Sequence, residues 1–137
     1  MNDIEIPYGH QCLDGDDREA VNRVLLGDWL TQGPAVPSFE DAVAERVGAK
    51  FAVAFSSGTA ALHGAAFAAG IGPGEIIVTT PLTFMASLNC IRYVGARLTL
   101  VDIDSVTLNI NLASIPEDAP GLLAVHYAGL PVDLRAL

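Results

Sequence analysis

Residues 51–66, FAVAFSSGTAALHGAA, decide the fold that this sequence predicts. Residues 51–55 form a continuous apolar run, which is typical of a β-strand buried on both faces. Residues 56–59 then open an alanine-rich segment that predicts a helix to about Gly70. Because a buried strand leads directly into a helix, the stretch indicates an α/β protein.

The residues that follow continue the alternation of strand and helix. Residues 75–80 and 97–103 are predicted strands, and residues 83–94 between them are a predicted helix that Gly95 ends. Residues 121–127 are a fourth predicted strand. This order is typical of right-handed crossovers, so we expect a mostly parallel sheet.

The residues before the stretch predict two helices joined by a loop, and no strand. Residues 14–27 have an apolar stripe at helical spacing, with Asp14 placed to cap the helix. Residues 38–47 predict a second helix that Gly48 ends. Residues 28–37 lie between the two and contain one glycine and two prolines, which predict a loop.

The sequence ends within a predicted helix. Asp133 is placed as an N-cap, and Leu137 follows about one helical turn later. One turn is not stable by itself, because nucleation fixes several residues for a single hydrogen bond. Truncation of a longer protein and a natural frayed end both fit this pattern.

Composition excludes several classes of partner. A net charge of −9 with only seven Lys and Arg residues leaves no basic surface for nucleic acid. The most apolar stretch, residues 60–71, is shorter than the ~20 residues that cross a bilayer, and the N-terminus does not have the pattern of a signal peptide.

Cys12 and Cys90 are expected to be reduced thiols, and no residues have the spacing of metal ligands. We therefore expect a cytoplasmic protein.

The turn Ser57-Gly58-Thr59-Ala60 is a candidate phosphate site. The first turn of a helix has unpaired N–H groups and a positive potential, which together favour an anion. Gly58 lets the backbone approach closely, and the Thr59 hydroxyl adds a donor. The alternative is an ordinary Ser/Thr helix cap. Neither a Walker A loop nor a GxGxxG dinucleotide motif is present.

A second candidate lies in residues 78–87, VTTPLTFMAS, after the next predicted strand. Loops at the carboxyl ends of parallel strands form the ligand crevice of such sheets. Phe84 is placed where an aromatic ring could cover a planar heterocycle beside the phosphate. The alternative is a phenylalanine packed in the core.

These motifs, taken in order, resemble the DegT/DnrJ/EryC1/StrS sugar aminotransferases over nearly the whole chain. The form of the opening and of DWLTQGP is most similar to the branch that aminates UDP-linked 4-keto-6-deoxy amino sugars on the pseudaminic acid pathway, the UDP-4-amino-4,6-dideoxy-N-acetyl-altrosamine transaminases. The matching segments are IPYGHQCLDGDDREAV, LTQGP, Phe39-Glu40, SSGTAAL, TPLTFMAS, GARLTLVDID, TLNI and HYAG.

The resemblance implies an incomplete, three-layer large domain of the aspartate aminotransferase fold type I, a pyridoxal-phosphate transferase fold. Residues 1–49 would be an N-terminal arm with helices. Residues 50–137 would be the first part of the domain that binds pyridoxal 5′-phosphate, truncated at its end. The family also implies a homodimer.

The family's binding residues carry over to positions in this sequence. Gly58, Thr59 and Ala60 would bind the phosphate of the cofactor, and Phe84 would stack on its pyridine ring. The substrates implied are a nucleotide sugar and glutamate. The nucleotide sugar would be held by Tyr8, Trp29, Leu30, Thr31 and Ser57.

Two functional residues of the family have no counterpart before Leu137: the aspartate that pairs with the pyridinium nitrogen and the Schiff-base lysine. The one lysine here, Lys50, precedes the first predicted strand and is expected to be a solvated surface residue. Asp102 and Asp104 are expected to cap the turn that follows the third strand. We therefore expect no transamination by this chain alone. The alternative is a non-catalytic remnant that binds a phosphate ligand or a protein partner.

Overall fold

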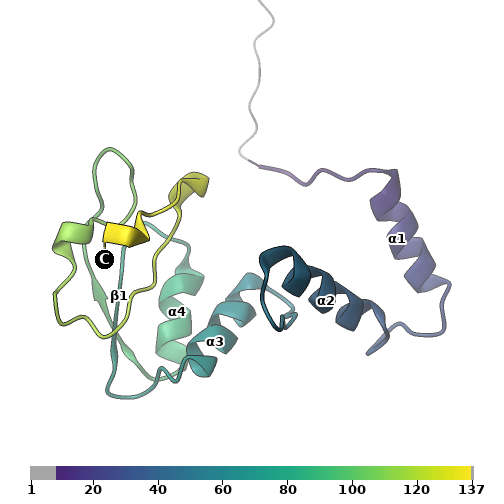
Figure 1. Cartoon of the computed structure of the whole chain (residues 1–137), viewed down its shortest axis with the longest axis horizontal. Helices are drawn as coiled ribbons and strands as arrows, with labels where there is room; N and C mark the ends of the chain where they lie inside the picture. The colour runs from purple at the N-terminus through teal and green to yellow at the C-terminus, as the bar shows by residue number, and fades with distance from the viewer. Residues whose placement is uncertain (1–8, 137) are drawn as a thin grey trace, which may run out of the picture. The chain divides into compact units, whose positions relative to one another are not determined.

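A computed structural model describes residues 9–136 (Figure 1). Tyr8, a predicted substrate residue, lies outside the described residues. The chain forms two compact units, of which the first extends to Ala54 and the second begins at Phe55. Among the described residues, no helix is long and apolar enough to span a membrane.

The first helix, α1 (Gly15–Leu25), begins at Asp14 as predicted. The Asp14 carboxylate accepts hydrogen bonds from the N–H groups of Asp16 at 2.9 Å and Asp17 at 3.2 Å. The Asp17 carboxylate in turn accepts from the Asp14 N–H at 3.0 Å, which completes a capping box. These bonds satisfy N–H groups that have no partner within the helix, so they fix where it begins.

The second helix, α2 (Ala35–Val47), begins at Ala35 rather than at the expected Ser38. The prediction failed because it treated Pro37 as part of the loop. Proline is tolerated in the first turn of a helix, where its missing N–H would have no partner in any case. Gly48 ends α2 as predicted, in the left-handed conformation with φ 68° that glycine adopts without strain.

Residues 51–55 do not form the predicted strand. In the described residues the ladder of paired strands does not include them, and Phe51 and Val53 are 76% and 70% exposed. The Ala54 N–H donates instead to the Glu40 carboxylate at 2.8 Å. The Phe55 ring lies directly on Gly64 of the next helix. The apolar run has strand-like composition, but a strand requires a neighbouring strand to pair with.

The second unit contains the predicted alternation of helices and strands (Figure 1). The two strands pair in parallel, with Ile76 opposite Arg97 and Thr79 opposite Leu100, which confirms the predicted parallel arrangement. The helices on either side of the first strand pack against each other. In chain order these elements are α3 (Gly58–Ala68), β1 (Ile76–Thr79), α4 (Met85–Tyr93) and β2 (Arg97–Leu100).

The fourth predicted strand, residues 121–127, is reduced to one parallel bridge between Val78 and Leu122. The Val78 N–H donates to the Gly121 carbonyl and its carbonyl accepts from the Leu123 N–H, both at 2.9 Å. A turn at Tyr127–Gly129 ends the extended segment. Although no regular strand forms there, β1 is hydrogen-bonded along both edges.

Neighbouring residues of β1 belong to different parts of the core, because successive side chains in a strand point to opposite faces. Ile77 packs in a cluster with Cys90 and Ile91 of α4, partly covered by α3. Val78 packs with Ile110 and Val132 in a second cluster. β1 therefore connects the two clusters.

Of the three aspartates expected as caps in the second half of the chain, Asp104 and Asp133 accept from the turns that follow them, whereas the Asp102 carboxylate accepts from the adjacent Ile103 N–H at 2.8 Å. Asp104 accepts from the N–H and hydroxyl of Thr107 and from the N–H of Val106. The backbone hydrogen bond from Thr107 is the main reason that the pKa of Asp104 is lowered. Asp133 accepts from the Arg135 N–H at 3.2 Å, although the element there is a 3₁₀ turn, Leu134–Ala136.

The two cysteines should react differently with thiol reagents. Cys90 is fully buried and burial raises the pKa of its thiol, whereas Cys12 is exposed. Because the thiolate is the reactive form, a disulfide reagent should label one thiol per native chain and two in denaturant. The Cys12→Ser variant should show no rapid labelling in the native state. Equal labelling rates for the two thiols in the native chain would contradict the packing around α4.

Gly33 should be required for the conformation of the loop between α1 and α2. A Cβ atom at this position would lie 2.6 Å from the Trp29 Cβ, and both atoms are attached directly to the backbone. Gly33→Ala should therefore displace the loop, at a cost of about 1–3 kcal/mol, and change the emission of Trp29, the only tryptophan in the chain. Gly27→Ala is the matched control, because its Cβ would meet nothing closer than 3.4 Å. Identical emission spectra for the two variants would refute this prediction.

Candidate anion-binding site

In the described residues, two backbone donors in the first turn of α3 have no partner. Ser57 is the N-cap, and its backbone is extended with φ −162° and ψ 160°. Its hydroxyl accepts from the Ala60 N–H at 3.2 Å, and its carbonyl accepts from the Ala61 N–H at 3.0 Å. Within the part of the chain that the structure describes, the N–H groups of Gly58 and Thr59 have no acceptor.

The backbone at the start of α3 is accessible at Ser57 and Gly58. Ser57 and Gly58 are exposed, and Thr59 and Ala60 are half-buried. A Cβ atom built on Gly58 would meet nothing within 4 Å. An anion can therefore approach the backbone, and the positive end of the helix dipole favours it there.

The cap and the anion compete for Ala60, one of the predicted phosphate contacts. Its N–H is already bonded to the Ser57 hydroxyl, so that hydroxyl would have to rotate before Ala60 could donate to a ligand. The predicted helix cap and the predicted anion site are therefore not exclusive alternatives. Ser57 fills the cap role, while Gly58 and Thr59 keep their donors free within the described chain.

Phe84 lies at the same edge of the second unit as this turn. Helix α3 leads into β1 and α4 follows it, so both helices run antiparallel to β1 and lie side by side (Figure 1). Their N-termini therefore both lie at the edge where β1 ends. Phe84 is the N-cap of α4 and is 78% exposed, so the alternative of a core phenylalanine is wrong.

Hydrogen bonds of the buried Asn109 side chain, which were not predicted from the sequence, fix a turn at this edge. Asn109 is 5% exposed, and its side chain accepts from the Tyr127 N–H at 2.9 Å and donates to the Leu130 carbonyl at 3.0 Å. The Val132 N–H donates to Nδ1 of His126 at 3.1 Å. These bonds hold the turn that follows the extended segment beside β1. A single polar residue between leucine and isoleucine, in TLNI, was the available signal.

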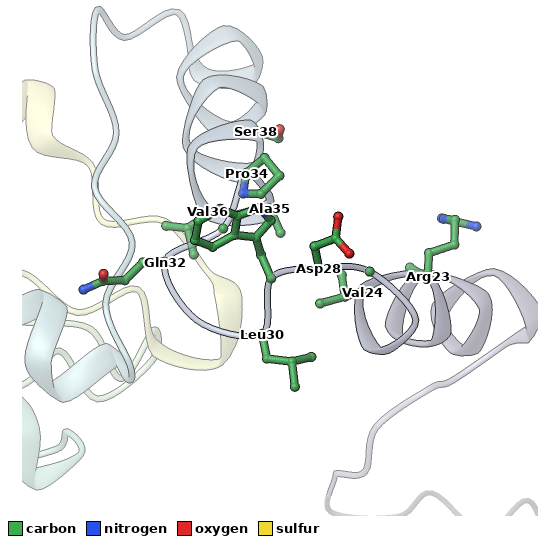
Figure 2. Close-up of a pocket in the computed structure, with 13 residues that line it drawn as sticks. Arg23, Val24, Asp28, Leu30, Gln32, Pro34, Ala35, Val36 and Ser38 are labelled. Carbon is green, nitrogen blue, oxygen red and sulfur yellow. The ribbon is translucent and has the colours of Figure 1, made fainter.

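The predicted substrate residues are divided between the two units. Trp29 and Leu30 line a pocket of about 560 Å³ in the first unit, between the end of α1 and the start of α2 (Figure 2). Arg23 and Asp28 are the charged residues of its lining. Thr31 is exposed and does not line this pocket. Ser57 belongs to the second unit, where it caps α3.

Comparison with known proteins identifies relatives along almost the whole chain. SpsC of Bacillus subtilis (strain 168), a spore coat polysaccharide biosynthesis protein, is 39% identical over 136 residues, which cover 96% of this chain and 35% of SpsC. Helicobacter pylori PseC, an aminotransferase involved in the biosynthesis of pseudoaminic acid, is 33% identical with a TM-score of 0.86; the match covers 97% of this chain and 37% of PseC.

A further solved structure is the PLP-form of Spr1654 from Streptococcus pneumoniae. It is 26% identical with a TM-score of 0.83, and the match covers 95% of this chain and 34% of Spr1654. The chain thus spans about a third of the length of these relatives. These likenesses confirm the predicted fold class, the α/β architecture of the fold type I aminotransferases.

Residues 11–137 match the model of the DegT/DnrJ/EryC1/StrS aminotransferase family. The match begins before α1 and includes the start of α3, Phe84 and Asn109. The chain belongs to the DegT/DnrJ/EryC1/StrS aminotransferase family.

Proposed function

We propose that this chain forms the phosphate-binding and ring-binding part of a pyridoxal-phosphate-dependent aminotransferase. The whole enzyme would aminate a nucleotide-linked 4-keto-6-deoxy sugar with glutamate as the amino donor. The observation that carries the proposal is that, within the described residues, the amides of Gly58 and Thr59 have no acceptor at the start of α3, in a member of this family. The likeness to PseC and SpsC supports a sugar as the substrate class.

The residues at the start of α3 fit a phosphate monoester. Gly58 and Thr59 each have an N–H without an acceptor in the described residues, and Thr59 adds a hydroxyl, so we expect three neighbouring donors for one dianion. Hydrogen bonds to a charged oxygen are about twice as strong as neutral ones. No carboxylate occurs in α3 itself, so nothing in that helix repels the anion.

Phe84 provides a surface for the ring of the cofactor. Its side chain is largely exposed, and it lies at the same edge as the phosphate turn. Stacking a flat heterocycle on this ring would remove apolar area of both from water. When bound, pyridoxal phosphate supplies an electron sink for charge that develops at the amino carbon. Trp29, Leu30, Thr31, Ser57 and Tyr8 are our proposed contacts for the nucleotide sugar.

We propose that the amine that would hold the cofactor covalently is not among the described residues. Lys50 is exposed, and its Nζ lies 5.1 Å from the centroid of the Phe51 ring. It belongs to the first unit, before α3. We therefore propose that the 137 residues bind the cofactor without catalysing transamination. A non-catalytic module that binds a phosphate ligand is the second candidate, and the same observation favours it.

Exposed apolar side chains support a further polypeptide as partner. Phe67 of α3 is 77% exposed, and another polypeptide could cover a large apolar side chain of this kind. We propose a cytoplasmic homodimer for the whole enzyme.

Removing one backbone donor should test the phosphate site directly. Gly58 is the first residue of α3, a position that proline favours, and the extended backbone of Ser57 is compatible with a following proline. Gly58→Pro therefore deletes the Gly58 N–H while keeping the helix. Its affinity for pyridoxamine phosphate, measured by ligand fluorescence, should fall about 10- to 100-fold, because hydrogen bonds to charged groups contribute about 1.5–3 kcal/mol.

Gly58→Ala is the matched control, since it restricts the same backbone and retains the N–H. The ratio of the two affinities isolates the contribution of the donor. Circular dichroism should show equal helix content in both variants. Equal affinities of the proline and alanine variants would exclude this amide as a ligand contact.

A further inference from the structure

The N-terminus of α4 begins without the usual cap. Its N-cap residue is Phe84, which has no side chain that can accept a hydrogen bond. Serine, threonine, aspartate and asparagine are preferred at this position because they satisfy a free N–H of the first turn. Some other contact must therefore fix where the helix begins and how Phe84 is presented.

A pair of hydroxyl groups on either side of Phe84 provides this contact. The Thr83 hydroxyl donates to the Ser87 hydroxyl at 2.8 Å. The Ser87 N–H donates to the Phe84 carbonyl at 3.0 Å. Ser87 is 8% exposed and Thr83 is half-buried, so the bond between them is largely shielded from water. The residue before Phe84 and the first turn after it are thereby tied together.

The turn before Thr83 is anchored in the same way. The Leu82 N–H donates to the Thr80 hydroxyl at 3.3 Å, and the Thr83 N–H donates to the Pro81 carbonyl at 3.1 Å. Thr80 is 1% exposed and directly follows β1. The chain from the end of β1 to the first turn of α4 is therefore fixed by its own hydrogen bonds.

The Phe84 ring itself contributes little to its own placement. It is 78% exposed, so its packing contacts are few, and its backbone is extended with φ −71° and ψ 143°. The direction of its Cα–Cβ bond depends on this backbone conformation, which the bond between Thr83 and Ser87 holds.

We propose that Thr83 and Ser87 are positioning residues that hold Phe84 ready to stack on the ring of a pyridoxal-type ligand. This inference rests on the proposed function, because it requires a phosphate-anchored ring at the start of α3. It assigns the phosphate and the ring to separate groups of residues. Losing the hydroxyl pair should therefore weaken binding of the ring and leave binding of the phosphate unchanged.

The test compares two probes on the 137-residue chain, pyridoxamine phosphate and inorganic phosphate. Thr83→Val removes the donor with little change of shape. The affinity of this variant for pyridoxamine phosphate should fall about 3- to 10-fold, the range expected for loss of an aromatic stacking contact. Its affinity for inorganic phosphate should be unchanged. Thr83→Ser should restore wild-type affinity. Phe84→Ala gives the upper limit of the effect.

Ser87→Ala removes the other hydroxyl and serves if the valine variant does not fold. It should show the same selective loss, and the Thr83→Val/Ser87→Ala double variant should show no further loss, because both changes break one bond. Thr83→Val and Ser87→Ala variants that fold and bind pyridoxamine phosphate like the wild type would overturn this inference alone. A wild-type chain that binds neither probe would refute the proposed function and the inference with it.

Discussion

The hydrogen bonding of β1 along both edges is the constraint on which the second unit depends. Its four residues pair with β2 on one side, and Val78 bonds to Gly121 and Leu123 on the other. Alternation of its side chains then places Ile77 in one apolar cluster and Val78 in the other. A strand this short can organise the unit because its backbone is bonded on both sides and three of its residues are buried.

The candidate site follows from the connections of this strand. Helix α3 ends just before β1 begins, and α4 begins just after β1 ends. Both helices must therefore present their N-termini at the same edge, although Gly58 and Phe84 are far apart in the sequence. Among the described residues, N–H groups without an acceptor come from the start of α3, and an exposed aromatic ring comes from the N-cap of α4. One edge thus offers the two kinds of contact that a phosphorylated heterocycle needs.

The sequence predicted the elements whose signals are local. Asp14 and Gly48 mark helix ends because capping depends on a few neighbouring residues, and both positions were predicted correctly. Residues 51–55 were wrong as a strand and residues 121–127 pair with β1 only around Leu122, because strand formation depends on a distant partner that local composition does not reveal. The start of α3 was predicted, since an apolar run followed by Ser57-Gly58-Thr59 is also a local pattern.

The contacts that complete the site were not predicted, because they join residues by geometry. The hydrogen bond between the Thr83 and Ser87 hydroxyls depends on where the first turn of α4 begins. That position could not be predicted from the sequence, because its N-cap is a phenylalanine. The bonds of Asn109 to a turn 18 and 21 residues away could not be predicted either. Exposure of Phe84 likewise needed coordinates, because its sequence pattern fits a core residue equally well.

The account depends above all on the ability of the Gly58 and Thr59 amides to bind an anion. Backbone amide NMR during a titration with inorganic phosphate tests this most directly. The account predicts large, saturable shifts at these two amides and a smaller one at Ala61, whose N–H is already bonded to the Ser57 carbonyl at 3.0 Å. Unchanged resonances of Gly58 and Thr59 at saturating phosphate would contradict it.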